Sequence, residues 1–218
     1  MEKIIILGGI GNGTVIAQAI VDANNRGSNE YEIVGYLNDR EEVGSSIEGF
    51  PVLGKIKEAS NFAKQGYKFI NTLYRIDGQQ ERLDLFQSLE LVDSDLAIFV
   101  HPTAFVAPNV EIEPGAVIMP YVMISAGAMI GKGTLIMVGA SIGHNTKLGP
   151  YNHIAAQAVV GAYIETGIGV HIGLNATVRE NLVIGDHATL GMGAVLTKNI
   201  NQKEIWIGNP AIFLRNVK

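Results

Sequence analysis

Residues 129–160 read MIGKGTLIMVGASIGHNTKLGPYNHIAAQAVV, and an aliphatic residue returns at every sixth position of this stretch. The period extends in both directions along the chain, and only Thr166 interrupts it. The aliphatic positions are Val100, Val106, Ile112, Ile118, Ile124, Ile130, Ile136, Ile142, Leu148, Ile154, Val160, Ile172, Val178, Ile184, Leu190 and Leu196. A fixed period of this length indicates a structural repeat.

Each hexad also has a second recurring position, four residues after the aliphatic one, that is usually small or β-branched. Glycine often follows the aliphatic residue directly, which suits a short flat strand that ends in a bend. Three hexads would close one coil of eighteen residues, so residues eighteen apart should stack on neighbouring rungs about 4.8 Å apart. The pattern predicts a solenoid of triangular section over residues 100–218, and it leaves the hand of the coil open.

The first hundred residues follow a different pattern. Residues 3–13, KIIILGGIGNG, predict a strand that runs into a glycine-rich turn, and residues 14–25 predict a helix. Strands at 31–39 and 67–74 alternate with helices at 55–65 and 79–91. The alternation predicts a small parallel, Rossmann-like α/β domain over residues 1–99. Its ligand should lie at the carboxyl ends of the strands, near residues 8–13 and 38–40.

Composition excludes several classes of function. The net charge is −5 and 17% of residues are charged, so no basic surface is available for nucleic acid. The chain has no cysteine, which excludes disulfides, thiolate zinc sites and a cysteine nucleophile. The apolar run at the N-terminus is too short for a signal peptide or a membrane span. We therefore expect a cytoplasmic protein that acts on a small molecule, with neither nucleic acid nor membrane as its partner.

The glycine-rich turn is weak evidence for a redox dinucleotide. The third glycine of that fingerprint would stand at position 14, which is Thr14. Backbone amides and a helix N-terminus can equally hold the diphosphate of a nucleotide-sugar.

Taken in order, six segments resemble one family along almost the whole chain. The family is that of the hexapeptide-repeat sugar acyltransferases, typified by sialic acid O-acetyltransferases and bacillosamine-pathway N-acetyltransferases. The segments are ILGGIGNG (6–13), YLND (36–39), FPVLG (50–54), FVHPTAFVAPNVEI (99–112), ASIGHNTKLGPYNHIAAQAVV (140–160) and IWIGNPA (205–211). The resemblance implies a left-handed parallel β-helix, a homotrimer whose sites are shared between subunits, and acetyl-CoA as co-substrate.

The resemblance also assigns roles to residues. It implies that His144 is the general base with Asn145 beside it, a role for which the unperturbed imidazole pKa of about 6.5 is suited. It implies that acetyl-CoA contacts His153, Gly173, Leu174, Gly191 and Met192. It implies that the nucleotide-sugar contacts Gly11, Asn12, Gly13, Asn38, Asp39 and Arg40. No metal is expected, because the histidines lack the spacing of the zinc carbonic anhydrases that share this type of helix.

Three departures from the family pattern bear on function. An acid commonly stands where Asn145 stands, so Glu165 or Glu180 is a candidate substitute. Related enzymes commonly carry histidine and aspartate where this chain has Asn12 and Asn38. The stretch NTLYRIDGQQER (71–82) is longer than usual, and it is either a simple loop insertion or a changed substrate contact.

The leading hypothesis is therefore N-acetylation of a nucleotide-linked amino-sugar, such as a 4-amino-4,6-dideoxyhexose, for surface polysaccharide assembly. O-acetylation of a sialic-acid-like sugar is the alternative reaction. A non-catalytic scaffold or sugar-binding module is the alternative of another class.

Overall fold

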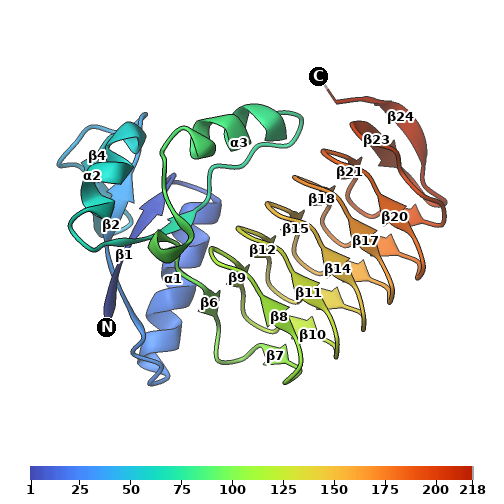
Figure 1. Ribbon diagram of the computed structural model, residues 1–218, viewed down its shortest axis with the longest axis horizontal. Coiled ribbons are helices and arrows are strands. Elements are labelled where there is room, and N and C mark those ends of the chain that lie inside the picture. The colour runs from blue at the N-terminus through green and yellow to red at the C-terminus, as the bar shows by residue number, and fades with distance from the viewer. Residues whose placement is uncertain (218) are drawn as a thin grey trace.

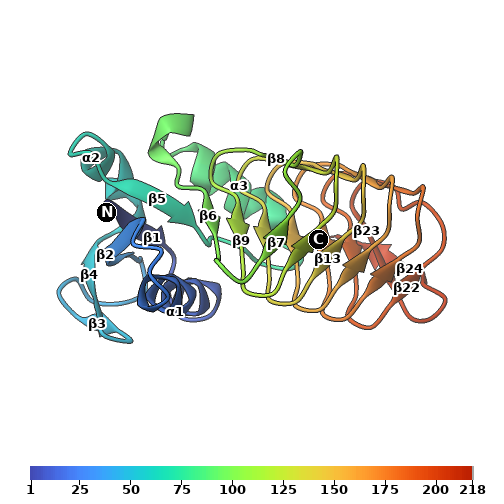
Figure 2. The same ribbon diagram turned by 90° about the horizontal axis from the view of Figure 1, so that it is seen from below.

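The computed structural model describes residues 1–217 and places two parts side by side. An α/β domain formed by the first part of the chain lies at one end of a long coil of stacked strands (Figure 1). Seen from below, the coils succeed one another along the molecule away from this domain (Figure 2). No helix within these residues is long and apolar enough to span a bilayer.

The α/β domain is built on a five-stranded sheet of order β3-β4-β2-β1-β5. Its strands are β1 (Glu2–Leu7), β2 (Tyr31–Leu37), β3 (Ser46–Ile47), β4 (Phe50–Gly54) and β5 (Lys68–Asn71). All neighbours pair in parallel except β3 and β4, which form an antiparallel hairpin. The small parallel sheet predicted from the alternating pattern is confirmed, although the pattern did not reveal the β3–β4 hairpin.

Two of the three predicted helices, at 55–65 and 79–91, are shorter in the structure, whereas the first begins at Asn12, two residues earlier than predicted. The helices of this domain are α1 (Asn12–Asn25), the 3-10 turn η1 (Ile56–Glu58), α2 (Ala59–Ala63), α3 (Gln79–Gln87) and the 3-10 turn η2 (Asp93–Asp95). The predicted third strand was also too long. It ends at Asn71, and residues 72–78 leave the sheet to cross toward the β-helix.

The β-helix predicted from the six-residue period is confirmed. Two-residue strands stack in parallel on three sides, and each pairs with the strand eighteen residues away, as His153 does with His171. The six-stranded side holds β7 (Phe105–Val106), β10 (Met123–Ile124), β13 (Ser141–Ile142), β16 (Val159–Val160), β19 (Thr177–Val178) and β22 (Val195–Leu196). The five-stranded side holds β8 (Glu111–Ile112), β11 (Met129–Ile130), β14 (Lys147–Leu148), β17 (Glu165–Thr166) and β20 (Val183–Ile184).

The third, eight-stranded side begins and ends the coil. It holds β6 (Phe99–Val100), β9 (Val117–Ile118), β12 (Leu135–Ile136), β15 (His153–Ile154), β18 (His171–Ile172), β21 (Thr189–Leu190), β23 (Glu204–Ile207) and β24 (Ile212–Asn216). Helix α3 lies along this side (Figure 1). The outward side chains of this side are buried from β6 to β21, whereas β24 and most outward side chains of the other two sides are exposed.

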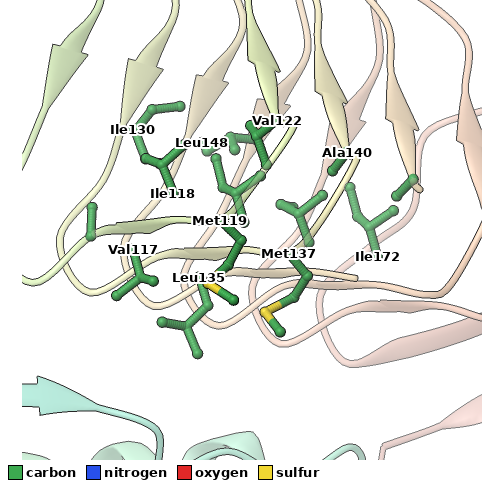
Figure 3. Close-up of a cluster of buried hydrophobic side chains, with 14 of the residues drawn as sticks. Val117, Ile118, Met119, Val122, Ile130, Leu135, Met137, Ala140, Leu148 and Ile172 are labelled. Atoms are coloured by element: carbon green, nitrogen blue, oxygen red, sulfur yellow. The ribbon is translucent and has the colours of Figure 1, made fainter. Parts of the chain in front are cut away.

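The interior of the coil is aliphatic, because the residues of the six-residue series point inward. Ile118, Ile130, Leu148 and Ile172 all lie in this core (Figure 3), with their side chains almost completely removed from solvent. Burial of such rows contributes about 25 cal/mol for each Å² of apolar surface. It is the main term that holds short strands together.

Thr166, the exception in the aliphatic series, belongs to a polar pair inside the coil. Its hydroxyl donates to Asn152 Oδ1 at 2.7 Å and accepts the Gly149 N–H at 2.9 Å. The amide of Asn152 in turn donates to the carbonyl oxygens of Gly149, Pro150 and Gly167. Since each polar group has a partner, the interruption carries little desolvation cost.

Candidate functional site

His144 lies on the corner between β13 and β14, and its side chain is exposed. The next residue, Asn145, has a φ of 57°, a left-handed conformation that asparagine tolerates better than most residues. Its Oδ1 is 3.0 Å from His144 Nδ1. An amide oxygen only accepts, so in the neutral tautomer that fits this contact the proton is on Nδ1 and Nε2 has the lone pair. The corner therefore presents an oriented imidazole whose free nitrogen can take a proton from a substrate.

Tyr163, one coil further along, packs against the same imidazole. The two ring centroids are 5.0 Å apart and the rings are nearly perpendicular, at 85°. Asn145 and Tyr163 also line a groove of about 490 Å³ together with Lys147 and Glu165. The ring is thus held from two directions beside an open groove.

The two carboxylates considered as substitutes for the missing acid do not contact His144. Glu165 accepts from Lys147 Nζ at 3.4 Å on the five-stranded side. Glu180 is exposed and stands two coils away from His144 in the stack. Asn145 is accordingly the side chain that hydrogen-bonds the imidazole among residues 1–217.

His153 and His171 form a buried stack with Tyr74. The imidazoles are paired across β15 and β18 with centroids 5.2 Å apart, as their eighteen-residue spacing predicted. The Tyr74 ring lies parallel over His153, at 4.3 Å between centroids and 12° between planes, and 5.5 Å from His171. Tyr74 comes from the segment that leaves the sheet after β5, so the α/β domain itself covers the two histidines.

Burial holds both imidazoles neutral. It lowers the pKa of His153 to about 4 and that of His171, with a smaller contribution from its neighbour His153, to about 3. Burial also raises the pKa of the Tyr74 hydroxyl. Neither histidine can act as a cation at neutral pH in this arrangement.

Asn12 links the two predicted binding regions. Its Nδ2 lies 3.2 Å from His153 Nε2, which makes Nε2 the acceptor and leaves the proton on the other nitrogen, Nδ1. That Nδ1 is buried and has no hydrogen-bond partner. A residue expected to contact the nucleotide-sugar therefore touches one expected to contact the coenzyme.

Leu174 lies on the corner after β18 and Met192 on the corner after β21, and their side chains are 54% and 78% exposed. Gly173 and Gly191, which precede them, were expected to permit close approach of a ligand. The packing of the coils gives a second reason for glycine at both positions. A Cβ on Gly173 would lie 2.6 Å from the Met192 nitrogen, and one on Gly191 would lie 2.8 Å from Ile207 Cγ2. The coils stack too closely at these corners for a side chain.

The glycine-rich turn and the end of β2 border a cavity of about 510 Å³, a size suited to a nucleotide. Asn38, Asp39 and Arg40 line it, but Gly11, Asn12 and Gly13 do not. Three of these predicted ligand residues therefore lie outside the cavity.

Asn38 and Asp39 hold the loop in shape. Asn38 donates to the Gly8 carbonyl at 2.8 Å and accepts from the N–H groups of Arg40 and Glu41. Asp39 accepts from the Ile56 N–H at 3.0 Å. Arg40, which lines the same cavity, brings a cationic side chain to it.

The other wall of the cavity holds residues that the sequence did not single out individually, although it left the stretch 71–82 open as a substrate contact. Thr72, Leu73, Tyr74, Arg75 and Arg82 line it, all from or next to the long stretch 71–82. The two arginines were visible in the sequence, but nothing there indicated that they would face the glycine-rich turn. Across residues 1–217, no three His, Asp or Glu side chains gather as a metal site requires.

Comparison with known proteins matches both parts of the chain. Residues 3–73 match the PglD N-terminal domain, and residues 127–162 match the bacterial transferase hexapeptide repeat. The chain is a hexapeptide-repeat protein with a PglD-type N-terminal domain. The resemblance drawn from the sequence motifs is thereby confirmed.

Solved structures agree with this assignment. The acetyltransferase domain of PglB from Neisseria gonorrhoeae is 26% identical, with a TM-score of 0.85 over 98% of this chain and 100% of that one. The same domain was also solved with acetyl coenzyme A. Perosamine N-acetyltransferase from Caulobacter crescentus, a mutant solved with CoA and GDP-perosamine, is 22% identical, with a TM-score of 0.85 over 99% and 98% of the two chains. WeeI from Acinetobacter baumannii is 21% identical, with a TM-score of 0.77 over 97% and 100%.

Proposed function

We propose that this protein is an acetyl-CoA-dependent N-acetyltransferase that acts on a nucleotide-linked amino-sugar. The observation that carries the proposal is the imidazole of His144, exposed on a hexapeptide corner and held through Nδ1 so that Nε2 is free. The cavity at the glycine-rich turn is of a size that suits a nucleotide, which supports a substrate whose sugar is linked to a nucleotide. The PglB domain solved with acetyl coenzyme A and the perosamine enzyme solved with CoA and GDP-perosamine support the two substrates.

The reaction needs a base and a leaving thiolate. His144 Nε2 would take a proton from the sugar amine as the amine nitrogen attacks the thioester carbonyl. The carbon–sulfur bond then breaks, the acetyl group stays on the nitrogen, and the CoA sulfur receives the proton from the imidazolium. Asn145 would keep the imidazole in the required tautomer throughout, since its oxygen accepts only from Nδ1.

We further propose that the working unit is a homotrimer. His144 lies on a corner of the six-stranded side, whereas His153 belongs to the eight-stranded side, so one chain does not bring them together. The outer face of the six-stranded side also exposes Phe105, Met123 and Val159, with Ser141 between the last two. Exposed apolar side chains of this kind are suited to burial against another copy, which would place the His144 of one copy near the coenzyme-binding face of the next.

The cellular setting follows from the substrates. Acetyl-CoA and nucleotide-sugars would be met in the cytoplasm, and an N-acetylated nucleotide-sugar would serve surface polysaccharide assembly. The six residues predicted to contact the nucleotide-sugar, and the five predicted to contact acetyl-CoA, remain part of this proposal.

The test is a direct assay. The protein is incubated with acetyl-CoA and a panel of nucleotide-linked 4-amino, 3-amino and hydroxyl sugars, while thiol release is followed with a chromogenic reagent. We expect release with an amino-sugar and an amide product by mass spectrometry. Release only with hydroxyl sugars would replace the proposal with O-acetylation. Silence across the panel, with no binding of CoA, would favour a scaffold.

A further inference from the structure

The stretch 72–82 bridges the α/β domain and the β-helix and is anchored on the helix at three points. Tyr74 stacks on His153, and Asp77 forms a two-pronged ion pair with Arg215 at 2.8 and 3.1 Å. Gln79 Nε2 donates to Thr189 Oγ1 at 3.0 Å in a buried contact. A segment fixed at three points on a rigid coil holds its other side chains in place.

Two of those other side chains are the arginines that face the nucleotide cavity. Arg82, in the first turn of α3, is half-buried and has neither a side-chain hydrogen bond nor an ion pair within residues 1–217. Arg75 is exposed and has only a loose pairing with Glu81, at 3.6 Å. Arg40 lines the same cavity from the loop after β2. Three guanidinium groups around one cavity make a site of positive charge that suits an anion.

The wall opposite Arg75 and Arg82 includes the glycine-rich turn, at Gly8 and Gly9. A Cβ on Gly8 would lie 2.2 Å from Thr72 Oγ1, and one on Gly9 would lie 2.3 Å from Asn38 Nδ2, so a side chain at either position would collide with these neighbours. The lack of side chains at the two glycines lets an anion approach the main chain of the turn. The cavity, at about 510 Å³, has room for a nucleoside diphosphate between the two walls.

We propose that Arg82, assisted by Arg75 and Arg40, binds the diphosphate of the nucleotide-sugar in this cavity. The long stretch 71–82 would then be a substrate contact rather than a simple insertion. The inference rests on the proposed function, because it assumes that the sugar is linked to a nucleoside diphosphate. A guanidinium matches two phosphate oxygens at once, which explains the choice of arginine over lysine at such a site.

The carboxylates of the cavity are compatible with this assignment. Asp39 and Glu41 stand on the loop after β2, and Asp39 already accepts a backbone hydrogen bond from Ile56. Both can accept from ribose hydroxyls or base amines, so they would face the nucleoside end of the ligand. The arginines of the stretch 71–82 are left for the phosphates.

The test compares ligands that differ only in phosphate. Isothermal titration calorimetry measures the affinity of the full-length protein for UDP, GDP and dTDP, and for the corresponding nucleosides. The variants are Arg82→Gln, Arg82→Lys and Arg75→Gln, with Lys64→Gln as the control. Lys64 is an exposed cation of the same domain that lies outside the cavity.

We expect Arg82→Gln to weaken the preferred nucleoside diphosphate at least about tenfold while leaving the nucleoside within about twofold. The nucleotide affinity of Arg82→Lys should lie between those of the wild type and Arg82→Gln. Arg75→Gln should lose less affinity than Arg82→Gln, and Lys64→Gln should bind the nucleotide like the wild type. Inorganic pyrophosphate should compete with the nucleotide in the wild type and compete poorly in Arg82→Gln. An unchanged melting temperature of Arg82→Gln would show that the fold is kept.

Other outcomes separate the inference from the proposed function. Equal nucleotide affinity in wild type and Arg82→Gln would overturn the arginine assignment and leave the acetyltransferase intact. A parallel loss of nucleoside binding would overturn it too, because the arginine would then not act on phosphate. Arginine-dependent nucleotide binding with no acetyl transfer to any sugar would overturn the function alone. No binding of any nucleoside diphosphate by the wild type would overturn both.

Discussion

The corner that carries His144 and the side that carries His153 are built from the same hexad, yet they give their histidines opposite environments. His144 is exposed and keeps one ring nitrogen free. His153 is 7% exposed, covered by Tyr74 and held neutral by burial. The repeat decides where a side chain points, and the packing of the α/β domain decides what the side chain can do chemically. Variants can test each half of this contrast.

The largest expected effect is on turnover when the exposed imidazole is removed. His144→Ala should lower kcat at least about a hundredfold, since this is the usual contribution of a general base. The affinity for CoA, measured by calorimetry, should be largely kept. Turnover close to the wild-type value would show that His144 is not the base, and that its exposure has no catalytic consequence.

The next effect is on stability when the cover is removed from the buried pair. Tyr74→Ala should cost roughly 2 kcal/mol of unfolding free energy in urea, because a large ring packed against two imidazoles is lost. With less burial, the pKa of His153 should rise toward its ordinary value, which NMR titration would detect.

Tyr121→Ala is the matched control for this variant, since Tyr121 is 65% exposed. It should change the unfolding free energy by less than about 0.5 kcal/mol. Equal effects of the two substitutions would show that the Tyr74 stack contributes nothing special to the contact between the domains.

A smaller effect is expected from the partner of His144. Asn145→Gly accepts the left-handed backbone but lacks the amide oxygen, so it should lower kcat about tenfold through loss of one hydrogen bond. Asn145→Asp restores an acceptor and should recover most of the loss. Full activity in Asn145→Gly would mean that Tyr163 and the groove orient the imidazole without Asn145.

The smallest effect is a change in how stability depends on pH. The folded-state pKa of His171 is about 3, below its unfolded value of about 6.5. The unfolded chain therefore binds protons first as pH falls, and stability that is present above pH 6.5 is lost as pH drops toward the folded value. Removing this histidine, as in His171→Asn, should reduce the loss between pH 7.5 and 6.0 by roughly 1 kcal/mol.

A non-titrating neighbour provides the control for that measurement. Thr189 follows His171 in the same ladder and accepts from Gln79, so Thr189→Val should lower stability at every pH without changing the slope. A slope in His171→Asn equal to that of the wild type would show that the histidine is accessible to protons in the folded state.

Much of the architecture could be predicted because periodicity is a local property. An aliphatic residue every six positions suits a coil with three short sides, so the coil and the stacking of His153 on His171 followed from spacing, although the hand of the coil did not. Thr166 could not be explained in advance, because its partner Asn152 is supplied by the neighbouring coil. The contacts of the stretch 71–82 could not be predicted either, because their partners, Thr189 and Arg215, lie more than a hundred residues away in the chain.

The sequence by itself determined the six-residue repeat and the glycine-rich turn, because each depends on neighbours close in the chain. Only the tertiary structure decided that Tyr74 covers His153 and His171, that Asn12 reaches His153, and that Arg75 and Arg82 face the glycine-rich turn. The physical reason is that burial, and its effect on the pKa of a side chain, depends on how the α/β domain packs against the β-helix. A local sequence pattern does not specify that packing.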